Sequence, residues 1–227
     1  ALLREECARV SISLGAPGTW GLGMLFLPRE GGASERILEL FREIVLAEDQ
    51  DFLGVREVPV DRSAAGRSAQ ESAPHVVQVL VGPGTLPADD HALERKLYVI
   101  RKRFESEARA RGLAGGDLPY VASLSTRTVV YKGLLTPEQL PRFYRDLADP
   151  RTASSLAIVH QRFSTNTFPS WSRAHPYRRV AHNGEINTLP GNVGWMRARE
   201  PALASLTFGE DVHKLFPIVD ERGSDSA

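Results

Sequence analysis

The chain has 227 residues, with 28 basic (Lys and Arg) and 28 acidic side chains, so its formal net charge at pH 7 is zero. A balanced charge argues against a nucleic-acid surface, and no apolar run is long enough for a membrane span or a signal peptide. A single cysteine excludes a disulfide framework and a cysteine-cluster metal site within these residues. We therefore expect one globular cytoplasmic domain, or most of one, with its own core.

The first part of the chain predicts a buried strand followed by an amphipathic helix. Residues 20–27 form an uninterrupted apolar run, which is typical of a buried strand. Ser34 is expected to cap the helix that follows. One apolar stripe marks the buried face of this helix: Ile37, Leu38, Phe41, Ile44 and Val45.

Two more strands, at 55–60 and 75–81, are expected on either side of a polar connector. The longest helix should begin at Asp89 or Asp90 and run to about Arg111. Its basic residues could form a nucleic-acid-binding stripe, but interleaved glutamates favour a solvated helix face.

The middle of the chain predicts further strands that lead into polar loops. Residues 120–125 and 128–131 are expected to pair across a tight turn, and Thr136 to cap a short helix. Short apolar or β-favouring runs at 156–159 and 177–181 predict two strands, each opening into a loop rich in Asn, Gly, Thr and Pro. Because rigid sites are often mounted on strand ends, both strands should deliver residues to one rim.

The last part of the chain predicts a helix over residues 193–206, with Trp195 and Met196 in the core, followed by an irregular or briefly helical stretch at 208–221.

Four residues of the predicted rim have chemistry that suits an amino-acid substrate. Arg162 follows a predicted strand and offers a planar fork of donors for a carboxylate. Asn183 and Gly184 place a side-chain amide beside an unobstructed backbone N–H, the usual parts of an oxyanion hole. Asp225 supplies one carboxylate in a loop of small residues. Each has a plainer interpretation, a surface ion pair for the arginine and a hairpin turn for Asn-Gly.

No metal site is expected at this rim. His175 and His182 flank it and Glu185 is near, but there is no H-E-x-x-H and the spacing suits no pair on a helix face. We expect His182 to position the Asn-Gly loop through a hydrogen bond.

Several strings in this part of the chain resemble one known family. R-F-S-T-N-T, A-H-P, A-H-N-G-E-I-N-T and G-S-D-S occur in this order, preceded by Y-V-A-S-L-S-T-R-T-V-V-Y-K-G-L-L-T and E-R-K-L-Y-V-I-R-K-R. Together they resemble the class II, N-terminal-nucleophile glutamine amidotransferase domain of the glutamate synthase large subunit. F-P-S-W and G-N-V-G-W-M-R-A-R-E point to the synthase branch, and the resemblance covers nearly the whole chain.

The resemblance implies a fold, a reaction and residue roles. The fold would be α+β, a four-layer αββα N-terminal-nucleophile hydrolase fold with antiparallel sheets. Arg162 would hold the α-carboxylate of glutamine and Asp225 its α-ammonium group, while Asn183 and Gly184 form the oxyanion hole. Glutamine would be hydrolysed to glutamate, and the ammonia passed to a synthase site acting on 2-oxoglutarate.

Cofactors and partners are expected outside this segment. The parent enzyme would carry FMN and an iron–sulfur cluster in its other domains, neither of which has a binding motif here. Its electron donor could be NADPH, NADH or ferredoxin, in some cases through a small electron-donating subunit.

The cysteine pattern departs from that of the family, whose nucleophile is an N-terminal cysteine followed by glycine. The only cysteine here is Cys7, followed by alanine in a charged segment, and we expect a buried or idle thiol. Residues 1–227 would then be part of a single amidotransferase domain, incomplete at both ends, with the nucleophile segment and the C-terminal remainder missing. The alternative is a catalytically dead glutamine-binding or structural module.

Overall fold

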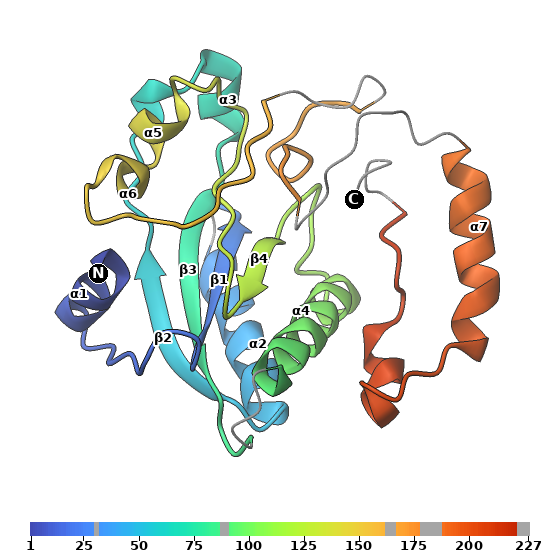
Figure 1. The fold of residues 1–227 in the computed structure, drawn as a ribbon. Helices are drawn as coiled ribbons and strands as arrows, with labels where there is room; N and C mark the ends of the chain where they lie inside the picture. The colour runs from blue at the N-terminus through green and yellow to red at the C-terminus, as the bar shows by residue number, and fades with distance from the viewer. Residues whose placement is uncertain (30–31, 87–90, 162–166, 178–187, 222–227) are drawn as a thin grey trace.

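A four-stranded antiparallel sheet forms the centre of the molecule (Figure 1). The computed structural model describes residues 1–29, 32–86, 91–161, 167–177 and 188–221. The strand order is β2-β3-β1-β4, and the strands are β1 (Gly21–Leu27), β2 (Asp51–Glu57), β3 (His75–Gly82) and β4 (Tyr120–Ser125). The strands predicted at 20–27, 75–81 and 120–125 are confirmed, whereas the strand predicted at 55–60 begins and ends earlier.

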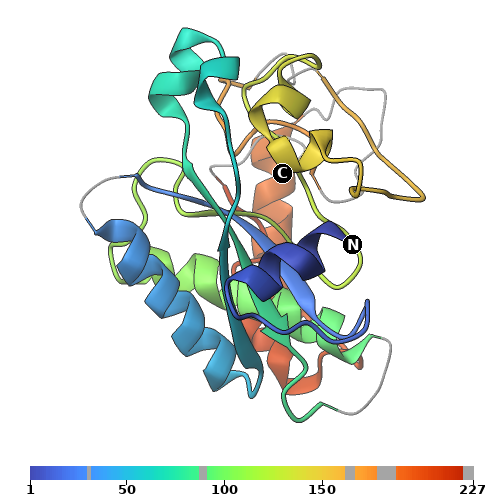
Figure 2. The same cartoon turned by 90° about the vertical axis from the view of Figure 1, so that its left-hand side faces the viewer.

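Two long helices cover one face of the sheet (Figure 2). They are α2 (Ala33–Ala47) and α4 (Ala92–Ala110), and their Phe41 and Phe104 rings meet edge to face with centroids 5.2 Å apart. Both helices were predicted, as was the apolar stripe of α2. The predicted cap is wrong: Gly32 precedes the helix in the left-handed region, and Ser34 donates its hydroxyl to the Pro28 carbonyl instead.

The opposite face is covered by short helices and loops. Its core side chains come from β1, β3 and β4 and from α3 (Arg67–Ser72), α5 (Leu140–Phe143), η1 (Arg62–Ala64) and the loop at Trp171. A third cluster lies at the end of the same face, where α1 (Leu2–Arg9) packs Cys7 against Leu22 and Leu80. Because both faces are covered, every residue of β1 is buried. The fold is therefore α+β with an antiparallel sheet, as predicted.

Two predicted strands are absent from the described residues. Residues 128–131 form no ladder with β4, because β4 pairs with β1 and the loop after it turns toward α4, where Glu94 accepts hydrogen bonds from Ser125 and Thr126. Residues 156–159 are also irregular, and Leu156 and Val159 are 75% and 80% exposed. Apolar character alone predicted a buried strand, but no described element packs over these side chains.

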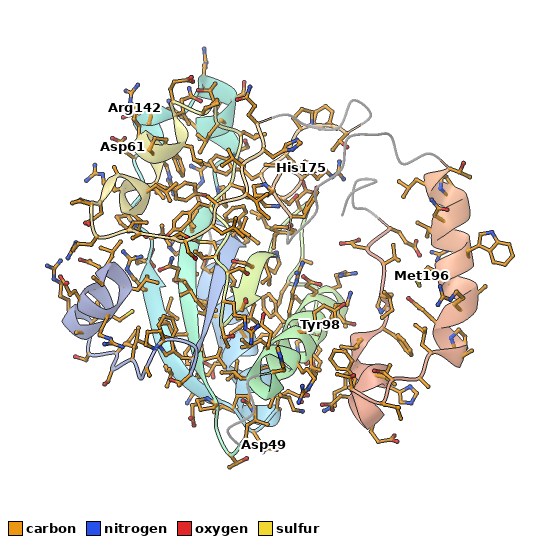
Figure 3. The ribbon with its side chains drawn as sticks, in the orientation of Figure 1. Asp49, Asp61, Tyr98, Arg142, His175 and Met196 are labelled. Atoms are coloured by element: carbon orange, nitrogen blue, oxygen red, sulfur yellow. The ribbon has the colours of Figure 1, made fainter. Side chains whose placement is uncertain are left out.

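The C-terminal part contains α7 (Leu189–Arg199), η2 (Glu200–Ala202) and η3 (Gly209–Leu215). In Figure 1, α7 lies at one side of the molecule, and none of its residues is buried. The prediction that Trp195 belongs to the core is wrong, since its side chain is 75% exposed. Met196, placed on α7 in Figure 3, is half-buried. The short helix η3 confirms the briefly helical stretch expected at 208–221.

The buried ion pair between Arg56 and Asp146 joins the sheet to α6 (Arg145–Ala148). Two hydrogen bonds of 2.8 Å connect the guanidinium of Arg56 on β2 to the two carboxylate oxygens of Asp146, and the side chains are 5% and 2% exposed. Tyr131 donates its hydroxyl to the same carboxylate at 2.9 Å.

None of the helices in the described part of the chain combines the length and apolar character needed to cross a membrane.

Candidate functional site

The four predicted site residues, Arg162, Asn183, Gly184 and Asp225, lie outside the described residues, and so do His182 and Glu185. What the structure describes is the chain on either side of them. The relevant flanks are 156–161 before Arg162, 167–177 between the two loops, and 216–221 before Asp225. The contacts of these flanks with the core define the surroundings of the candidate site.

Histidine and tyrosine rings join the flank of Arg162 to the flank of Asn183. The rings of His160 and His175 stack with centroids 4.3 Å apart, and the Tyr177 ring meets His175 edge to face at 4.7 Å. His160 is two residues before Arg162, and Tyr177 is six residues before Asn183. The segments that lead to the two predicted loops therefore lie side by side.

A buried lysine holds the second of these segments. The Lys132 side chain is 1% exposed, and its ammonium group donates to the Ser172 carbonyl at 2.7 Å and to the Tyr120 hydroxyl at 2.9 Å. The same Nζ lies 4.5 Å from the ring centroids of Tyr120 and Tyr177. Burial, together with the charge of Arg101, lowers the pKa of Lys132 well below its ordinary value.

The residue after Lys132 contacts the same segment at a further point. Gly133 packs directly under Trp171, where an added Cβ would lie within 2.7 Å of Cε3 of the indole ring. Trp171 also donates from Nε1 to the Ala69 carbonyl at 3.3 Å and packs on Phe143. In the Tyr-Lys-Gly sequence at 131–133, the tyrosine hydroxyl reaches Asp146, the lysine reaches Ser172, and the glycine makes room for Trp171.

The flank of Asp225 is fixed through α4. Lys102 donates from Nζ to the Ile218 carbonyl at 3.2 Å, and Arg109 lies 4.0 Å from Asp220. Further back, Lys214 of η3 donates to Glu48 at 3.0 Å. The chain that leads to Asp225 is therefore attached to the helical face of the sheet.

Glu48 is the centre of that attachment. Its side chain is 1% exposed and accepts hydrogen bonds from Lys96 at 2.8 Å, Arg103 at 2.7 Å and Lys214 at 3.0 Å. Burial alone would raise the pKa of Glu48, but the three cationic donors outweigh it and hold this pKa below its ordinary value. The cluster is a buried carboxylate satisfied on both oxygens.

A family model for the class-II glutamine amidotransferases matches residues 1–227. The chain belongs to this family. It is 48% identical over 227 residues to the glutamate synthase [NADPH] large chain of Bacillus subtilis, covering 100% of this chain and 14% of that protein. It is 41% identical over 209 residues to the ferredoxin-dependent glutamate synthase of Oryza sativa subsp. japonica, covering 91% of this chain and 13% of that protein.

A third relative is glutamate synthase [NADH] of Saccharomyces cerevisiae, 40% identical over 232 residues, with 99% of this chain and 11% of that protein covered. The chain thus spans 11–14% of the length of these three relatives. The family assignment made from the sequence strings is confirmed.

For a class-II amidotransferase, the state of the cysteine thiol decides whether it can attack an amide. Cys7, in the last turn of α1, is 0% exposed and packs against Ile12 and Leu22. Burial raises the pKa of the Cys7 thiol, an effect that the charge of Arg56 only partly offsets. The expectation of a buried thiol is confirmed.

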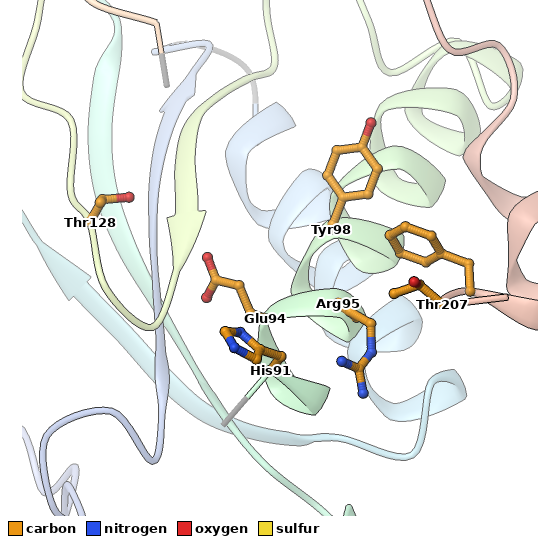
Figure 4. Close-up of a pocket in the computed structure, with 7 residues that line it drawn as sticks. His91, Glu94, Arg95, Tyr98, Thr128 and Thr207 are labelled. Atoms are coloured by element: carbon orange, nitrogen blue, oxygen red, sulfur yellow. The ribbon is translucent and has the colours of Figure 1, made fainter. Parts of the chain in front are cut away.

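A cavity of about 670 Å³ opens beside the first turn of α4 (Figure 4). Figure 4 shows Glu94 and His91 between Thr128 on one side and Arg95 and Thr207 on the other, with Tyr98 on the next turn of the helix. The Glu94 carboxylate accepts from Ser125 at 2.6 Å and from the Thr126 N–H at 2.7 Å, so it fastens the loop after β4.

This cavity is separate from the histidine stack, since His175 lies well apart from Tyr98 in Figure 3. Among the described residues, no three His, Cys, Asp or Glu side chains are grouped to hold a metal ion.

The sequence analysis missed Lys132 and Glu48. Each carried a weak signal. Lys132 directly follows the apolar run Val129–Tyr131, and Glu48 stands at the end of an amphipathic helix, with its three basic partners elsewhere in the chain. Neither signal identifies the partners, which lie 40 residues away for Ser172 and 166 residues away for Lys214.

Proposed function

We propose that this chain forms the glutamine-binding part of the glutaminase domain of a glutamate synthase. In the longer protein it would release glutamate and ammonia from glutamine, and the ammonia would serve the reductive amination of 2-oxoglutarate in glutamate biosynthesis. The observation that carries this proposal is the 48% identity, over all 227 residues, with a glutamate synthase large chain. The whole-chain match to the class-II family supports the same function.

The proposed residue roles follow from charge and hydrogen-bonding capacity. Arg162 pairs with the α-carboxylate of glutamine, and Asp225 pairs with its α-ammonium group. The Asn183 side-chain amide and the Gly184 N–H donate to the oxygen of the reacting amide as it becomes negatively charged. The order of these residues along the chain, and the contact between the His160 and His175 flanks, support a shared site.

The proposed mechanism uses a cysteine other than Cys7. A thiolate attacks the γ-amide carbon, and the tetrahedral oxyanion is held by Asn183 and Gly184. Ammonia leaves after protonation of its nitrogen, and water then hydrolyses the thioester to glutamate. An N-terminal cysteine supplies its own α-amino group as the base. The nitrogen of Cys7 is in a peptide bond and its thiol is buried, so this chain by itself would bind glutamine without hydrolysing it.

The domain would complete a four-layer αββα sandwich. The described sheet with α2 and α4 supplies one sheet and one helical layer, and family membership supports the other two. The exposed apolar residues at Leu156, Ile158 and Val159 fit a strand of a second sheet that other parts of the longer protein complete. Residues 1–227 would thus belong to one amidotransferase domain.

FMN and the iron–sulfur cluster would be carried by the remaining synthase domains. An iron–sulfur cluster needs three or four cysteine ligands, and this chain has one cysteine, which is buried. The residues of this chain therefore do not fit the cluster. The three relatives are named for NADPH, ferredoxin and NADH, so the electron donor would be one of these, delivered directly or through a small subunit.

An electrophilic glutamine analogue with a diazoketone in place of the amide tests the proposed function. The complete chain that carries this segment should be labelled once, on a cysteine outside residues 1–227, and should lose glutamate release in parallel. Cys7→Ser should leave both labelling and rate unchanged. Labelling of Cys7, or loss of activity in Cys7→Ser, would refute the assignment of the nucleophile. Glutamine binding without any labelling or release would instead favour a catalytically dead binding module.

A further inference from the structure

Lys132 is in an environment that ordinary structural lysines avoid. It is 1% exposed, and its described partners are neutral: the Ser172 carbonyl, the Tyr120 hydroxyl and the faces of two tyrosine rings. Burying an ammonium group without a carboxylate partner is costly, because only dipoles and ring faces offset the loss of its hydration. A methionine of similar length would fill the space without that cost, so packing alone does not account for the lysine.

The partners of Lys132 belong to two different parts of the fold. Tyr120 begins β4 and packs on Phe26 of β1, with ring centroids 6.0 Å apart, so it is part of the rigid sheet. Ser172 and Tyr177 belong to the segment that runs from Phe168 to Tyr177 between the two predicted loops. Through one atom, Nζ, the lysine therefore fixes the end of this segment to the sheet.

The point that is fixed is the start of the proposed oxyanion loop. Tyr177 is the last described residue before Asn183, six positions further on, and its own hydroxyl donates to the Arg173 carbonyl at 3.0 Å. A tyrosine ring held by an ammonium group on one side and by its hydroxyl at the far end cannot shift or rotate freely. These contacts fix the position of Tyr177 relative to Lys132 and Arg173.

We propose that Lys132 is a positioning residue for the loop that carries Asn183 and Gly184, an inference that rests on the proposed glutaminase function. Lys132 does not touch the substrate. It holds Ser172 and Tyr177, and so attaches the chain that leads to the two proposed oxyanion donors to the sheet. Because displacement of donors by about 1 Å can lower a rate about a hundredfold, loss of this anchor should appear in kcat.

The test compares Lys132→Met with Tyr144→Phe in the complete chain that carries this segment. Tyr144 is fully buried, and its hydroxyl donates to the backbone carbonyl of Lys132 at 2.8 Å. Tyr144→Phe therefore loosens the same stretch of backbone but leaves Nζ and its four contacts in place. It is the matched control for a general loss of stability. Glutamate release gives kcat and KM for glutamine, and thermal unfolding gives the stability of each variant.

We expect Lys132→Met to lower kcat at least tenfold, with KM for glutamine changed less than about twofold, since Arg162 and Asp225 still bind the substrate. Tyr144→Phe should lower the unfolding temperature and keep kcat within about twofold of wild type. If Lys132→Met does not fold, Tyr177→Leu replaces it, because this half-buried ring is the other partner in the contact and should give the same fall in kcat.

An unchanged kcat in Lys132→Met, or equal falls in kcat for Lys132→Met and Tyr144→Phe, would overturn the positioning role and leave the glutaminase function standing. A rise in KM with constant kcat would overturn it as well. Absence of glutamate release from the wild-type complete chain would overturn the proposed function, and this inference with it.

Discussion

Replacing Glu48 by alanine should destabilise the fold more than any change at a surface ion pair. The Glu48 side chain is 1% exposed and accepts hydrogen bonds from Lys96, Arg103 and Lys214, which come from α4 and η3. The variant removes the carboxylate that joins α2, α4 and η3. Lys96, Arg103 and Lys214 then keep only their other hydrogen-bond acceptors.

The size of the effect follows from those remaining acceptors. Removing one partner of a fully buried pair costs about 3–5 kcal/mol when a charge is left uncompensated. Here Lys96 and Lys214 still reach Asp211 at 2.7 and 2.8 Å, and Arg103 still reaches Glu107 at 2.9 Å. The three cationic side chains are also 23–39% exposed, so water can solvate part of their charge when the carboxylate is removed. We therefore expect a loss of about 2 kcal/mol, or about 4–8 °C in Tm for a chain of this size.

Thermal unfolding of the purified chain followed by circular dichroism measures this loss. Glu39→Ala, on α2, which ends just before Glu48, is the control, because its pair with Arg42 is half exposed on both sides and should contribute less than about 0.5 kcal/mol. A Tm for Glu48→Ala no lower than that of Glu39→Ala would refute the idea that the buried cluster joins these elements.

The same cluster predicts a pH dependence. The pKa of Glu48 is lower in the folded chain than its ordinary value of 4.5, so its contribution to stability is present above about pH 4.5 and is lost as the pH falls through the folded-state pKa. The difference in unfolding free energy between wild type and Glu48→Gln should therefore shrink in acid. A constant difference from pH 7 to pH 3 would contradict this origin.

Three further predictions concern the candidate site and its support. Arg162→Ala in the complete chain should raise KM for glutamine strongly, because the substrate carboxylate loses its partner; a mild effect would mean that the arginine is only structural. Asn183→Ala should lower kcat about a hundredfold or more, and an unchanged kcat would remove it from the mechanism. Gly133→Ala should cost about 1–3 kcal/mol in urea unfolding, because the new Cβ overlaps the Trp171 ring; wild-type stability would show that the indole moves aside.

The sequence predicted those parts of the fold whose burial is decided locally. Residues 20–27 are apolar throughout because β1 is covered by α2 and α4 on one face and by Trp171 and its neighbours on the other. The stripe from Ile37 to Val45 likewise fixes which side of α2 faces the sheet. In both cases the local pattern of apolar side chains, continuous in β1 and periodic in α2, was sufficient to predict the element.

The errors occurred where distant contacts decide the structure. Residues 126 and 127 were predicted to form a tight hairpin turn, but the Glu94 carboxylate holds Ser125 and Thr126 toward α4. Helix α1 was not predicted, because its amphipathic pattern is weak and its buried Cys7 packs on strands far along the chain. Trp195 was assigned to the core of a predicted helix, yet α7 buries none of its residues in the described structure.

The candidate site was predicted from motifs, and the structure adds the supports that motifs do not reveal. Arg162, Asn183, Gly184 and Asp225 could be identified because their chemistry suits glutamine and their strings resemble one family. Lys132 could not, because its function depends on a carbonyl 40 residues away and on two ring faces. A buried lysine among apolar neighbours becomes informative only when its partners are known.

The central claim is that this chain holds a glutamine site whose nucleophile lies elsewhere in the longer protein. The most direct test measures glutamate release and glutamine binding by the purified 227-residue chain, with its N-terminus verified by mass. Glutamine should bind detectably, Arg162→Ala should abolish that binding, and no glutamate should be released. Release of glutamate by this chain would contradict the account, because an attacking group would then have to lie within these residues.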